Sequence, residues 1–375
     1  MKILKRKYFI NCIICLLIFS TCGQVIRQSD YITINLSNRP SMSPVKASTL
    51  LEDFRYIPLE TTSESLIGHI RSSTTVIKDG FFVLDHLAQL NYFNAEGRFI
   101  RRIGSRGQGP GEFLNIVSFD VDEQKRLLYI YDMGRIFIYT FDNEFVRSIK
   151  VNAIGVLGKL MKTSWGYIAY NDPLQNLGKK TSVLITIDEE GNELNVLQTR
   201  KVDIQRSVFF NEPILKNFNG KYYYYPPYQD TIYSVHVDKI IPEYVLPKGR
   251  LSIAIEDMET LEKRSAAFAK GINLETFILD DHKLILFCTR QKKYELYFYD
   301  FASKKLSGIS EIVNDLDNSG NIDSYRWNWG IYQNQLVEFI PAYMLKENKE
   351  LPVTLKNLQE EDNPVIRIST LKSYQ

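Results

Sequence analysis

The chain has 375 residues, with 46 Lys and Arg against 44 Asp and Glu, and a formal net charge of +2. Aromatic residues make up 13% of it, which favours strands because flat rings pack well on a pleated surface. Four of the basic residues lie in the first seven positions, so the remainder is slightly acidic. This balance argues against a nucleic-acid partner, which requires a clustered basic face.

The N-terminus has the pattern of a secretory signal. The positive start MKILKRK precedes an apolar run, YFINCIICLLIFS, that is too short to span a bilayer. Ser20 and Thr21 before Cys22 resemble the lipobox of bacterial lipoproteins, in which the cysteine becomes the lipidated first residue, although Phe19 replaces the usual aliphatic residue. We therefore expect a lipoprotein signal peptide at 1–21 and a lipid on Cys22. An ordinary export signal cut nearby is the alternative.

Cysteine usage leaves no disulfide framework. Cys12 and Cys15 leave with the signal and Cys22 would carry lipid, so Cys288 remains. Cys288 lies in the apolar run LILFC, which predicts a buried and unreactive thiol.

A strand pattern recurs through the rest of the chain. A polar turn precedes a short strand-forming run in six segments: KDGFFVLD (78–85), QKRLLYIYD (124–132), SWGYIAYN (164–171), NGKYYYYP (219–226), DDHKLILFC (280–288) and YQNQLVEFI (332–340). Most of these runs are continuously apolar or aromatic, which is typical of strands packed on both faces. Strand–acidic turn–strand segments such as YFNAEGRFIRRI follow most copies and predict hairpins.

A repeat of roughly 40 to 60 residues with about four strands per unit predicts a β-propeller. The expected fold is all-β, with six four-stranded antiparallel blades and short helical insertions. We place a tether and N-terminal closing strand at 22–52 and the propeller at 53–375. The segments YITINL (31–36) and FRYIPLE (54–60) are expected to complete the sixth blade, together with a closing strand, VIRISTLK (365–372).

Two longer segments interrupt the repeat. In 251–271, the side chains of Ile255, Met258, Leu261 and Phe268 fall on one side at helical spacing, which predicts an amphipathic helix on the outside or rim of the propeller. Segment 341–364 is also expected to be helical, and it is polar.

The stretch GSRGQGPGEF (104–113) has four glycines and could suggest a phosphate loop. A phosphate loop opens a helix, whose N-terminal amides hold the anion. Here a predicted strand precedes the loop and another follows it, and Gly-Lys-Ser/Thr is absent. We therefore interpret the stretch as a crossing between two blades, with Arg106 and Glu112 as candidate functional side chains, and expect no nucleotide.

Three blocks carry a family resemblance: IPLETTSESLIG (57–68), GSRGQGPGEF, and the ending NPVIRI. Together they resemble a family of six-bladed β-propeller lipoproteins of Bacteroides-type bacteria, which is distantly similar to the NHL-repeat propellers. The resemblance covers nearly all of the mature chain. It implies the propeller fold and an envelope location, and it carries no catalytic residues.

In a propeller, the loops after the second strands and the crossings between blades share one face. As a hypothesis, this loop-rich face binds a ligand through these side chains: Asp85, His86, Arg106, Glu112, Asp132, Arg135, Asn171, Asp172, Tyr228 and Arg290. The alternative for Asp85 and Asp132 is that they accept backbone N–H bonds at strand ends.

The stretch YRWNWG (325–330) is the most unusual one. Trp327 and Trp329 alternate and so face one side of a predicted strand, where they would form a sugar-stacking platform or pack between blades six and one.

No spacing typical of a metal site occurs. The four histidines are too far apart for HxH or HExxH, and the GxSxG motif of a serine nucleophile is absent. We expect no catalytic residues, no metal and no cofactor.

The sequence therefore predicts a lipid-anchored β-propeller of the bacterial cell envelope that binds a glycan, a peptide or a partner protein. The alternatives are a lyase or hydrolase that uses carboxylates of the loop-rich face, with or without a metal, and a purely structural assembly partner.

Overall fold

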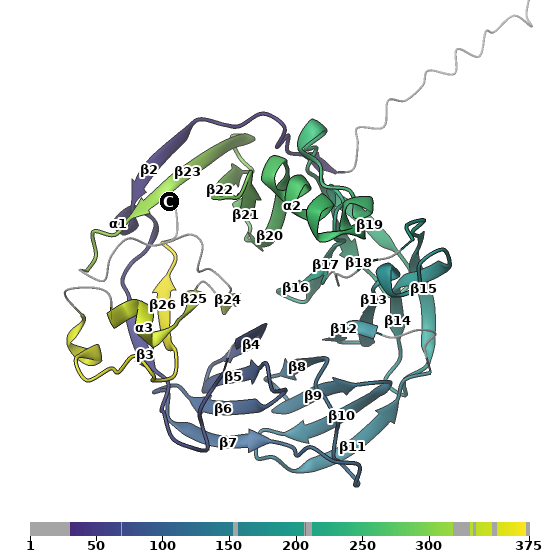
Figure 1. Cartoon of the computed structure of the whole chain (residues 1–375), viewed down its shortest axis with the longest axis vertical. Coiled ribbons are helices and arrows are strands. Elements are labelled where there is room, and N and C mark those ends of the chain that lie inside the picture. Colours follow the sequence, from purple (N-terminus) through teal and green to yellow (C-terminus); the bar gives the residue numbers. More distant parts are fainter. Residues whose placement is uncertain are drawn as a thin grey trace, which may run out of the picture.

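The computed structural model describes residues 31–68, 70–152, 157–205, 207, 212–317, 331–332, 335–346 and 351–372. Six sheets stand around a central axis, each with its first strand innermost (Figure 1). The predicted six-bladed β-propeller with four-stranded antiparallel blades is confirmed. The six repeated segments all form the second strand of their blade.

The first three blades follow one another along the chain. Blade 1 consists of β4 (Ile70–Ile77), β5 (Gly80–Asp85), β6 (Leu90–Asn94) and β7 (Phe99–Ile103). Blade 2 consists of β8 (Ser118–Asp122), β9 (Leu127–Asp132), β10 (Arg135–Thr140) and β11 (Phe145–Lys150). Blade 3 consists of β12 (Leu157–Thr163), β13 (Gly166–Asn171), β14 (Lys180–Ile187) and β15 (Glu193–Lys201).

The other three blades each recruit a strand from the N-terminal segment. Blade 4 consists of β16 (Ile214–Phe218), β17 (Lys221–Tyr225), β18 (Thr231–Val235), β19 (Ile240–Val245) and β1 (Ile32–Thr33). Blade 5 consists of β20 (Ile272–Leu279), β21 (Lys283–Arg290), β22 (Lys293–Asp300), β23 (Lys305–Val313) and β2 (Met42–Lys46). Blade 6 consists of β24 (Ile331–Tyr332), β25 (Gln335–Ile340), β26 (Val365–Thr370) and β3 (Arg55–Pro58).

Ring closure differs in part from the prediction. β3, from FRYIPLE, pairs antiparallel with β26 and completes blade 6 as expected. The segment YITINL was wrongly assigned to this blade, because its strand β1 pairs in parallel with β19 of blade 4. β2 likewise adds to β23 of blade 5 in parallel. The N-terminal segment thus runs along the outer edges of two blades before it closes the ring, and it covers edge strands that would otherwise be open.

Alternation along the second strands explains why these runs are continuously apolar. Phe81 and Val83 of β5 pack toward blade 6, whereas Phe82 and Leu84 pack toward blade 2. Successive strand residues point to opposite faces, and in a radial blade both faces meet a neighbour. The core therefore consists of six apolar layers, one between each pair of adjacent blades.

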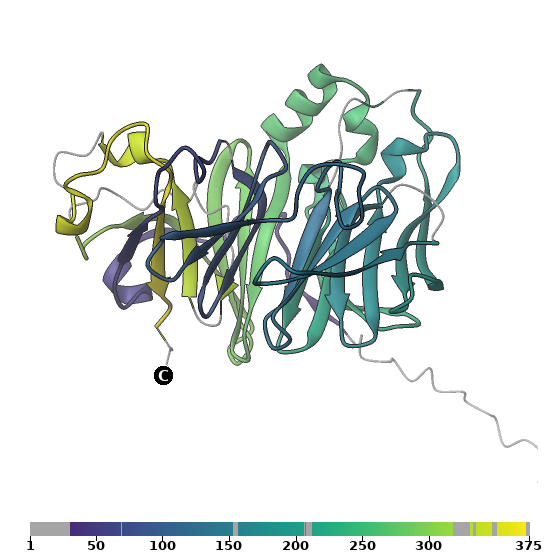
Figure 2. The ribbon, with the colours of Figure 1, turned by 90° about the horizontal axis from the view of Figure 1, so that it is seen from below.

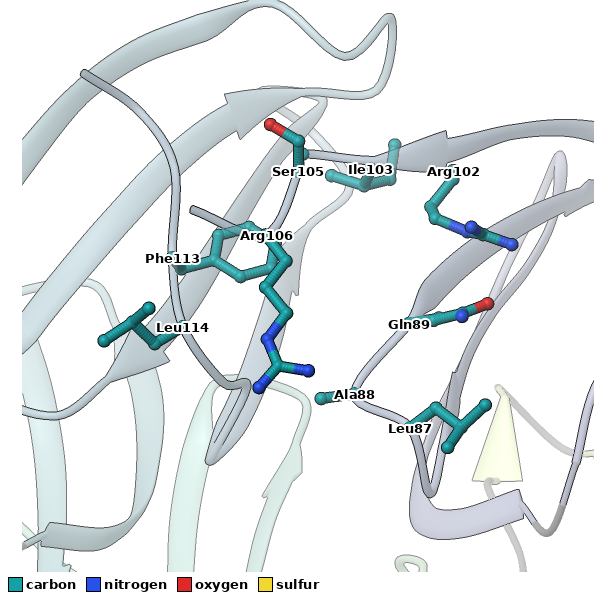
Figure 3. A pocket seen from close by; sticks show the side chains of 10 residues that line it. Leu87, Ala88, Gln89, Arg102, Ile103, Ser105, Arg106, Phe113 and Leu114 are labelled. Atoms are coloured by element: carbon teal, nitrogen blue, oxygen red, sulfur yellow. The ribbon is translucent and has the colours of Figure 1, made fainter. Parts of the chain in front are cut away.

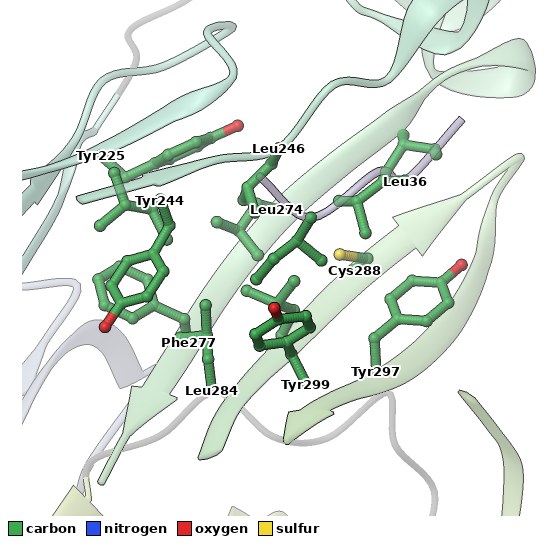
Figure 4. Packing of buried hydrophobic residues seen from close by; sticks show 14 of the residues in the cluster. Leu36, Tyr225, Tyr244, Leu246, Leu274, Phe277, Leu284, Cys288, Tyr297 and Tyr299 are labelled. Atoms are coloured by element: carbon green, nitrogen blue, oxygen red, sulfur yellow. The ribbon is translucent and has the colours of Figure 1, made fainter. Parts of the chain in front are cut away.

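The layer between blades 4 and 5 contains the cysteine that the sequence analysis singled out. Cys288 is 1% exposed and lies close to Leu36, Leu274 and Tyr297 (Figure 4). Burial raises the pKa of its thiol to about 12. The predicted buried thiol is confirmed.

Helical segments are few. The α-helices are α1 (Ala47–Leu50), α2 (Leu261–Lys270) and α3 (Ala342–Lys346). The short 3-10 helices are η1 (Pro173–Gln175), η2 (Gly249–Leu251), η3 (Ile255–Glu259) and η5 (Val353–Leu355). Within the described residues, every helix is too short or too polar to pass through a bilayer.

The segments around α2 and α3 both project from one face of the disc (Figure 2). The side chains of Ile255 and Met258 are buried there against Leu174 of blade 3. Leu261, which the helical spacing placed on the buried side, is 64% exposed. The difference arises because η3 and α2 meet at Thr260, which has an extended backbone and caps α2, so the spacing does not run through as one helix.

Candidate functional site

The loop-rich face carries the turns after the second strands and the crossings between blades. Asp85 ends β5 and Asp132 ends β9, so both stand where this face begins. Their positions are equivalent in the two blades, and both side chains are buried, at 0% and 7% exposure.

Each of these aspartates holds a loop. Oδ1 of Asp85 accepts the backbone N–H groups of Leu87 and Gln89, both at 2.9 Å. Oδ2 of Asp132 accepts the N–H of Leu114 at 2.7 Å, across the crossing from blade 1 to blade 2. The backbone-accepting alternative for both aspartates is thus observed, and these bonds fix the positions of Leu87, Gln89 and Leu114.

The glycine-rich crossing is closed by its own glutamate. Oε2 of Glu112 accepts the N–H of Gly109 at 2.8 Å, and a Cβ at Gly107 would collide with the same oxygen. The loop therefore wraps around a carboxylate that the chain itself supplies, and this carboxylate occupies the N–H of Gly109. β7 precedes the loop and β8 follows it, as predicted for a crossing between blades.

A groove of about 400 Å³ lies between this crossing and the turn after β5. Figure 3 shows the Arg106 side chain extending from the crossing toward Ala88, with Gln89 and Arg102 on one side of it and Leu114 on the other. The apolar lining includes Leu87 and Leu114, which are 58% and 46% exposed.

The two arginines of the groove differ in how they are held. Arg102 donates from Nε to Oδ1 of Asn91 at 3.2 Å and from Nη2 to the carbonyl of Glu64 at 2.8 Å. The guanidinium of Arg106 forms no hydrogen bond or ion pair with any residue that the structure describes. The donors of Arg106 therefore lie at the groove without a partner among the described residues.

His86 belongs to the turn that forms one side of the groove. Its side chain is exposed, and its imidazole lies so close to Gly68 that a Cβ there would collide with the ring. His86 thus packs the turn after β5 against the segment that enters blade 1.

The remaining candidates lie elsewhere on the molecule. Arg135 donates to Oγ of Ser148 at 3.3 Å on blade 2. Arg290 is 8% exposed and donates to the carbonyls of Leu36 and Ser37, at 2.9 and 3.2 Å, so it holds the N-terminal segment.

Asp172 and Tyr228 come together under the helical insertion. Asp172 accepts the N–H of Leu174 at 3.0 Å, and Tyr228 packs beside Leu174 in the cluster that η3 buries. Burial, the largest cause, raises the pKa of Tyr228 to about 12, against the opposing effect of Arg264. Asn171 ends β13 and is buried beside Asp172. Cys22, Trp327 and Trp329 lie outside the described residues.

The groove thus brings together some predicted residues and several that the sequence analysis missed. Arg106 lines it, and Asp85 and Asp132 hold its walls. Leu87, Gln89, Arg102 and Leu114 were not singled out, and their one signal in the sequence was proximity to Asp85 and to the glycine loop.

Two titratable groups with displaced pKa values lie on the inner strands, away from the groove. Burial raises the pKa of Asp120 to about 6, although its carboxylate accepts the N–H of Lys162 at 2.7 Å and of Val121 at 2.8 Å. Burial and then the charge of Lys159 lower the pKa of Lys216 to about 8. Among the side chains that can be placed, no three His, Cys, Asp or Glu residues gather as a metal site.

The fold is similar to solved structures from Bacteroides. A Bacteroides fragilis NCTC 9343 protein described as exported is 16% identical, with a TM-score of 0.67 over 92% of this chain and 100% of that one. A DUF4221 family member from Bacteroides vulgatus ATCC 8482 is 9% identical, with a TM-score of 0.52 over 86% of this chain and 97% of that one. At these identities the likeness shows the fold alone.

No curated protein matches the sequence. A family model does: the domain of unknown function DUF4934 matches residues 31–370. This match begins at β1 and ends with β26, so it includes all six blades together with the N-terminal strands. The chain therefore belongs to the DUF4934 family.

Proposed function

We propose that the protein is an exported binding module of the bacterial cell envelope, held at a membrane by a lipid on Cys22, which meets its ligand on the loop-rich face. The signal-like segment 1–21 supports export, as does the similarity to a Bacteroides fragilis protein described as exported. The ligand is a glycan, a peptide or a partner protein.

One observation carries the binding proposal. Arg106 extends into a groove of about 400 Å³, and its guanidinium has no partner among the described residues. The volume lies in the range of ordinary ligand sites, and an arginine fork with free donors is a group that recognises ligands. The walls are held by buried aspartates, so the site is largely formed before any ligand arrives.

A lyase or hydrolase that uses carboxylates of this face is the alternative. Asp85 and Asp132 would be the acid and base of such an enzyme, and one carboxylate oxygen of each accepts hydrogen bonds from backbone N–H groups. Neither lines the groove, so the geometry favours binding.

Thermal unfolding of the mature chain without its lipidated Cys22 (residues 23–375), with panels of oligosaccharides, peptides and divalent metals, tests the proposal. A ligand that binds only the native state raises the melting temperature by mass action. We expect a rise with a member of one panel that Arg106→Gln removes and Arg98→Gln retains, since Arg98 lies in the exposed turn between β6 and β7. A flat response to all panels contradicts a small ligand.

The same assay separates the other possibilities. A sugar-specific rise that Trp327→Ala removes, with Arg106→Gln unchanged, moves the site to the tryptophan pair. A rise in melting temperature with a divalent metal alone favours the enzyme over the binding module. Incorporation of labelled palmitate into the full chain, and its loss in Cys22→Ser, tests the anchor.

A further inference from the structure

The groove beside the glycine loop carries positive charge and no negative charge of its own. Its two charged lining residues are Arg102 and Arg106. The neighbouring carboxylates of Asp85, Asp132 and Glu112 accept the N–H groups of Leu87, Leu114 and Gly109, and none of the three lines the groove, whereas both guanidinium groups do. The field in the groove therefore favours an anionic ligand.

Arg106 is the side chain that would bind the anion directly. A guanidinium presents five donors in a planar fork that matches a carboxylate through two parallel hydrogen bonds. Arg102 is tied to Asn91 and Glu64, so it adds charge while its position stays fixed. The side chain of Gln89 makes no hydrogen bond with any described residue, and it adds a neutral donor and acceptor to the same groove.

Two exposed leucines flank these polar groups. Leu87 and Leu114 are 58% and 46% exposed, yet buried aspartates fix the backbone of each, through bonds of 2.9 and 2.7 Å. Exposed apolar side chains on a fixed backbone bury surface against a ligand with little loss of entropy.

The lining favours a peptide over a glycan. Among the described residues, Phe113 is the one aromatic residue that lines the groove, and it is 5% exposed. Its ring is packed edge-on against Phe137 and Tyr139, so it offers no open face on which a sugar could stack.

We propose that this groove binds a peptide segment that carries an Asp or Glu carboxylate between aliphatic side chains. Arg106 pairs with the carboxylate through its fork, and the aliphatic side chains lie on Leu87 and Leu114. The inference rests on the proposed function, because it names the ligand class of the same site.

Four probes test the ligand class by fluorescence anisotropy or calorimetry at low salt, with the mature protein (residues 23–375). These are a capped hexapeptide that alternates leucine and glutamate, the same peptide with glutamine for glutamate, a third with serine for leucine, and trigalacturonic acid. We expect the leucine–glutamate peptide to bind at least tenfold more tightly than the other three, because it alone supplies both carboxylates and aliphatic side chains.

Variants connect this binding to the groove. Arg106→Gln should weaken the leucine–glutamate peptide tenfold or more, and Arg106→Lys should weaken it less, since charge remains without the fork. Leu114→Ser should weaken that peptide but leave the weak binding of the serine–glutamate peptide unchanged. Arg98→Gln is the matched control, since it also neutralises one exposed arginine near blade 1 and should change nothing. Unchanged melting temperatures establish that the variants fold.

Several outcomes overturn the inference. If the glutamine peptide binds as tightly as the glutamate peptide, the ligand needs no carboxylate. If Arg106→Gln binds the leucine–glutamate peptide as tightly as the wild type does, the peptide binds elsewhere than in this groove. If trigalacturonic acid binds in an Arg106-dependent manner and no peptide binds, the ligand is an acidic glycan instead of a peptide. That result contradicts the inference but agrees with the proposed function. Failure of all four probes overturns the ligand class, and the function fails with it only if the thermal panels are also flat.

Discussion

Asn363 accepts the backbone N–H of Ile67 through Oδ1 at 2.8 Å and so joins the loop before β26 to the segment that enters blade 1. Its Nδ2 donates to the carbonyls of Glu60 and Ser65, at 2.7 and 2.9 Å. Asn363 is 1% exposed. One side chain thus connects the last blade to the first, and it links the NPVIRI block to the PLETT block.

Asn363→Ala should lower the free energy of unfolding by about 2–4 kcal/mol, because each buried backbone group left without a partner costs roughly 1–3 kcal/mol. Urea denaturation of the mature chain measures the loss. Asn357→Ala is the control, since Asn357 is exposed. Equal stability of the two variants would show that Asn363 contributes nothing to ring closure.

Gly111→Ala should cost about 2 kcal/mol or more. The backbone there has a φ of +84°, and a Cβ would lie 2.8 Å from Cγ of Phe145. Gly134 has a φ of +91° with nothing within 4 Å of a Cβ, so Gly134→Ala should cost only about 1 kcal/mol, which is the backbone strain. The difference in melting temperature isolates the collision. If Phe145→Ala in the same chain does not reduce the cost of Gly111→Ala, the collision is not its cause.

Arg290→Met should loosen the N-terminal segment while the blades stay folded. The change retains an apolar side chain but removes the donors to the carbonyls of Leu36 and Ser37, and hydrogen bonds to charged groups are worth roughly 1.5–3 kcal/mol. Chymotrypsin should then cleave after Leu36, which is 1% exposed in the folded chain, faster than in the wild type. An unchanged cleavage rate, with Arg98→Met as control, would show that Arg290 does not hold the segment.

Asp120 should make the protein less stable as the pH rises from about 4 to 6. Burial raises the pKa of its carboxyl to about 6 from an ordinary 3.8, so the folded state binds the proton more tightly than the unfolded state does. The stabilisation is complete below the unfolded pKa and is lost as the pH rises through the folded one. The unfolding free energy of Asp120→Asn, measured by urea at several pH values, should lack this decline. The same decline in the variant would assign it to another group.

The repeat structure could be predicted from the sequence because it is local. Residues 81–84 of β5 are all apolar and buried, and only a strand with a neighbour on each face buries such a run. The position of β1 could not be predicted in this way. Ile32 and Thr33 pair with Tyr244 and Val245 of blade 4, and the short strand carries no pattern that specifies which edge it joins.

The candidate site was only partly foreseeable. Arg106 stood out because the glycine loop drew attention to it, and Asp85 because it ends a repeated strand. Leu114 and Gln89 have no unusual local sequence, and they matter because Asp132 and Asp85 hold them at one groove.

Hydrophobic periodicity and turn residues depend on near neighbours in the chain, so the sequence by itself determined the number of blades, the strands within them and the burial of Cys288. The tertiary structure alone decided which edges the N-terminal strands cover and which carboxylates accept hydrogen bonds from nearby backbone. It also decided that Arg106 reaches a groove without a partner among the residues that can be placed. Those outcomes depend on contacts between residues far apart in the chain, and these contacts form only when the ring of blades closes.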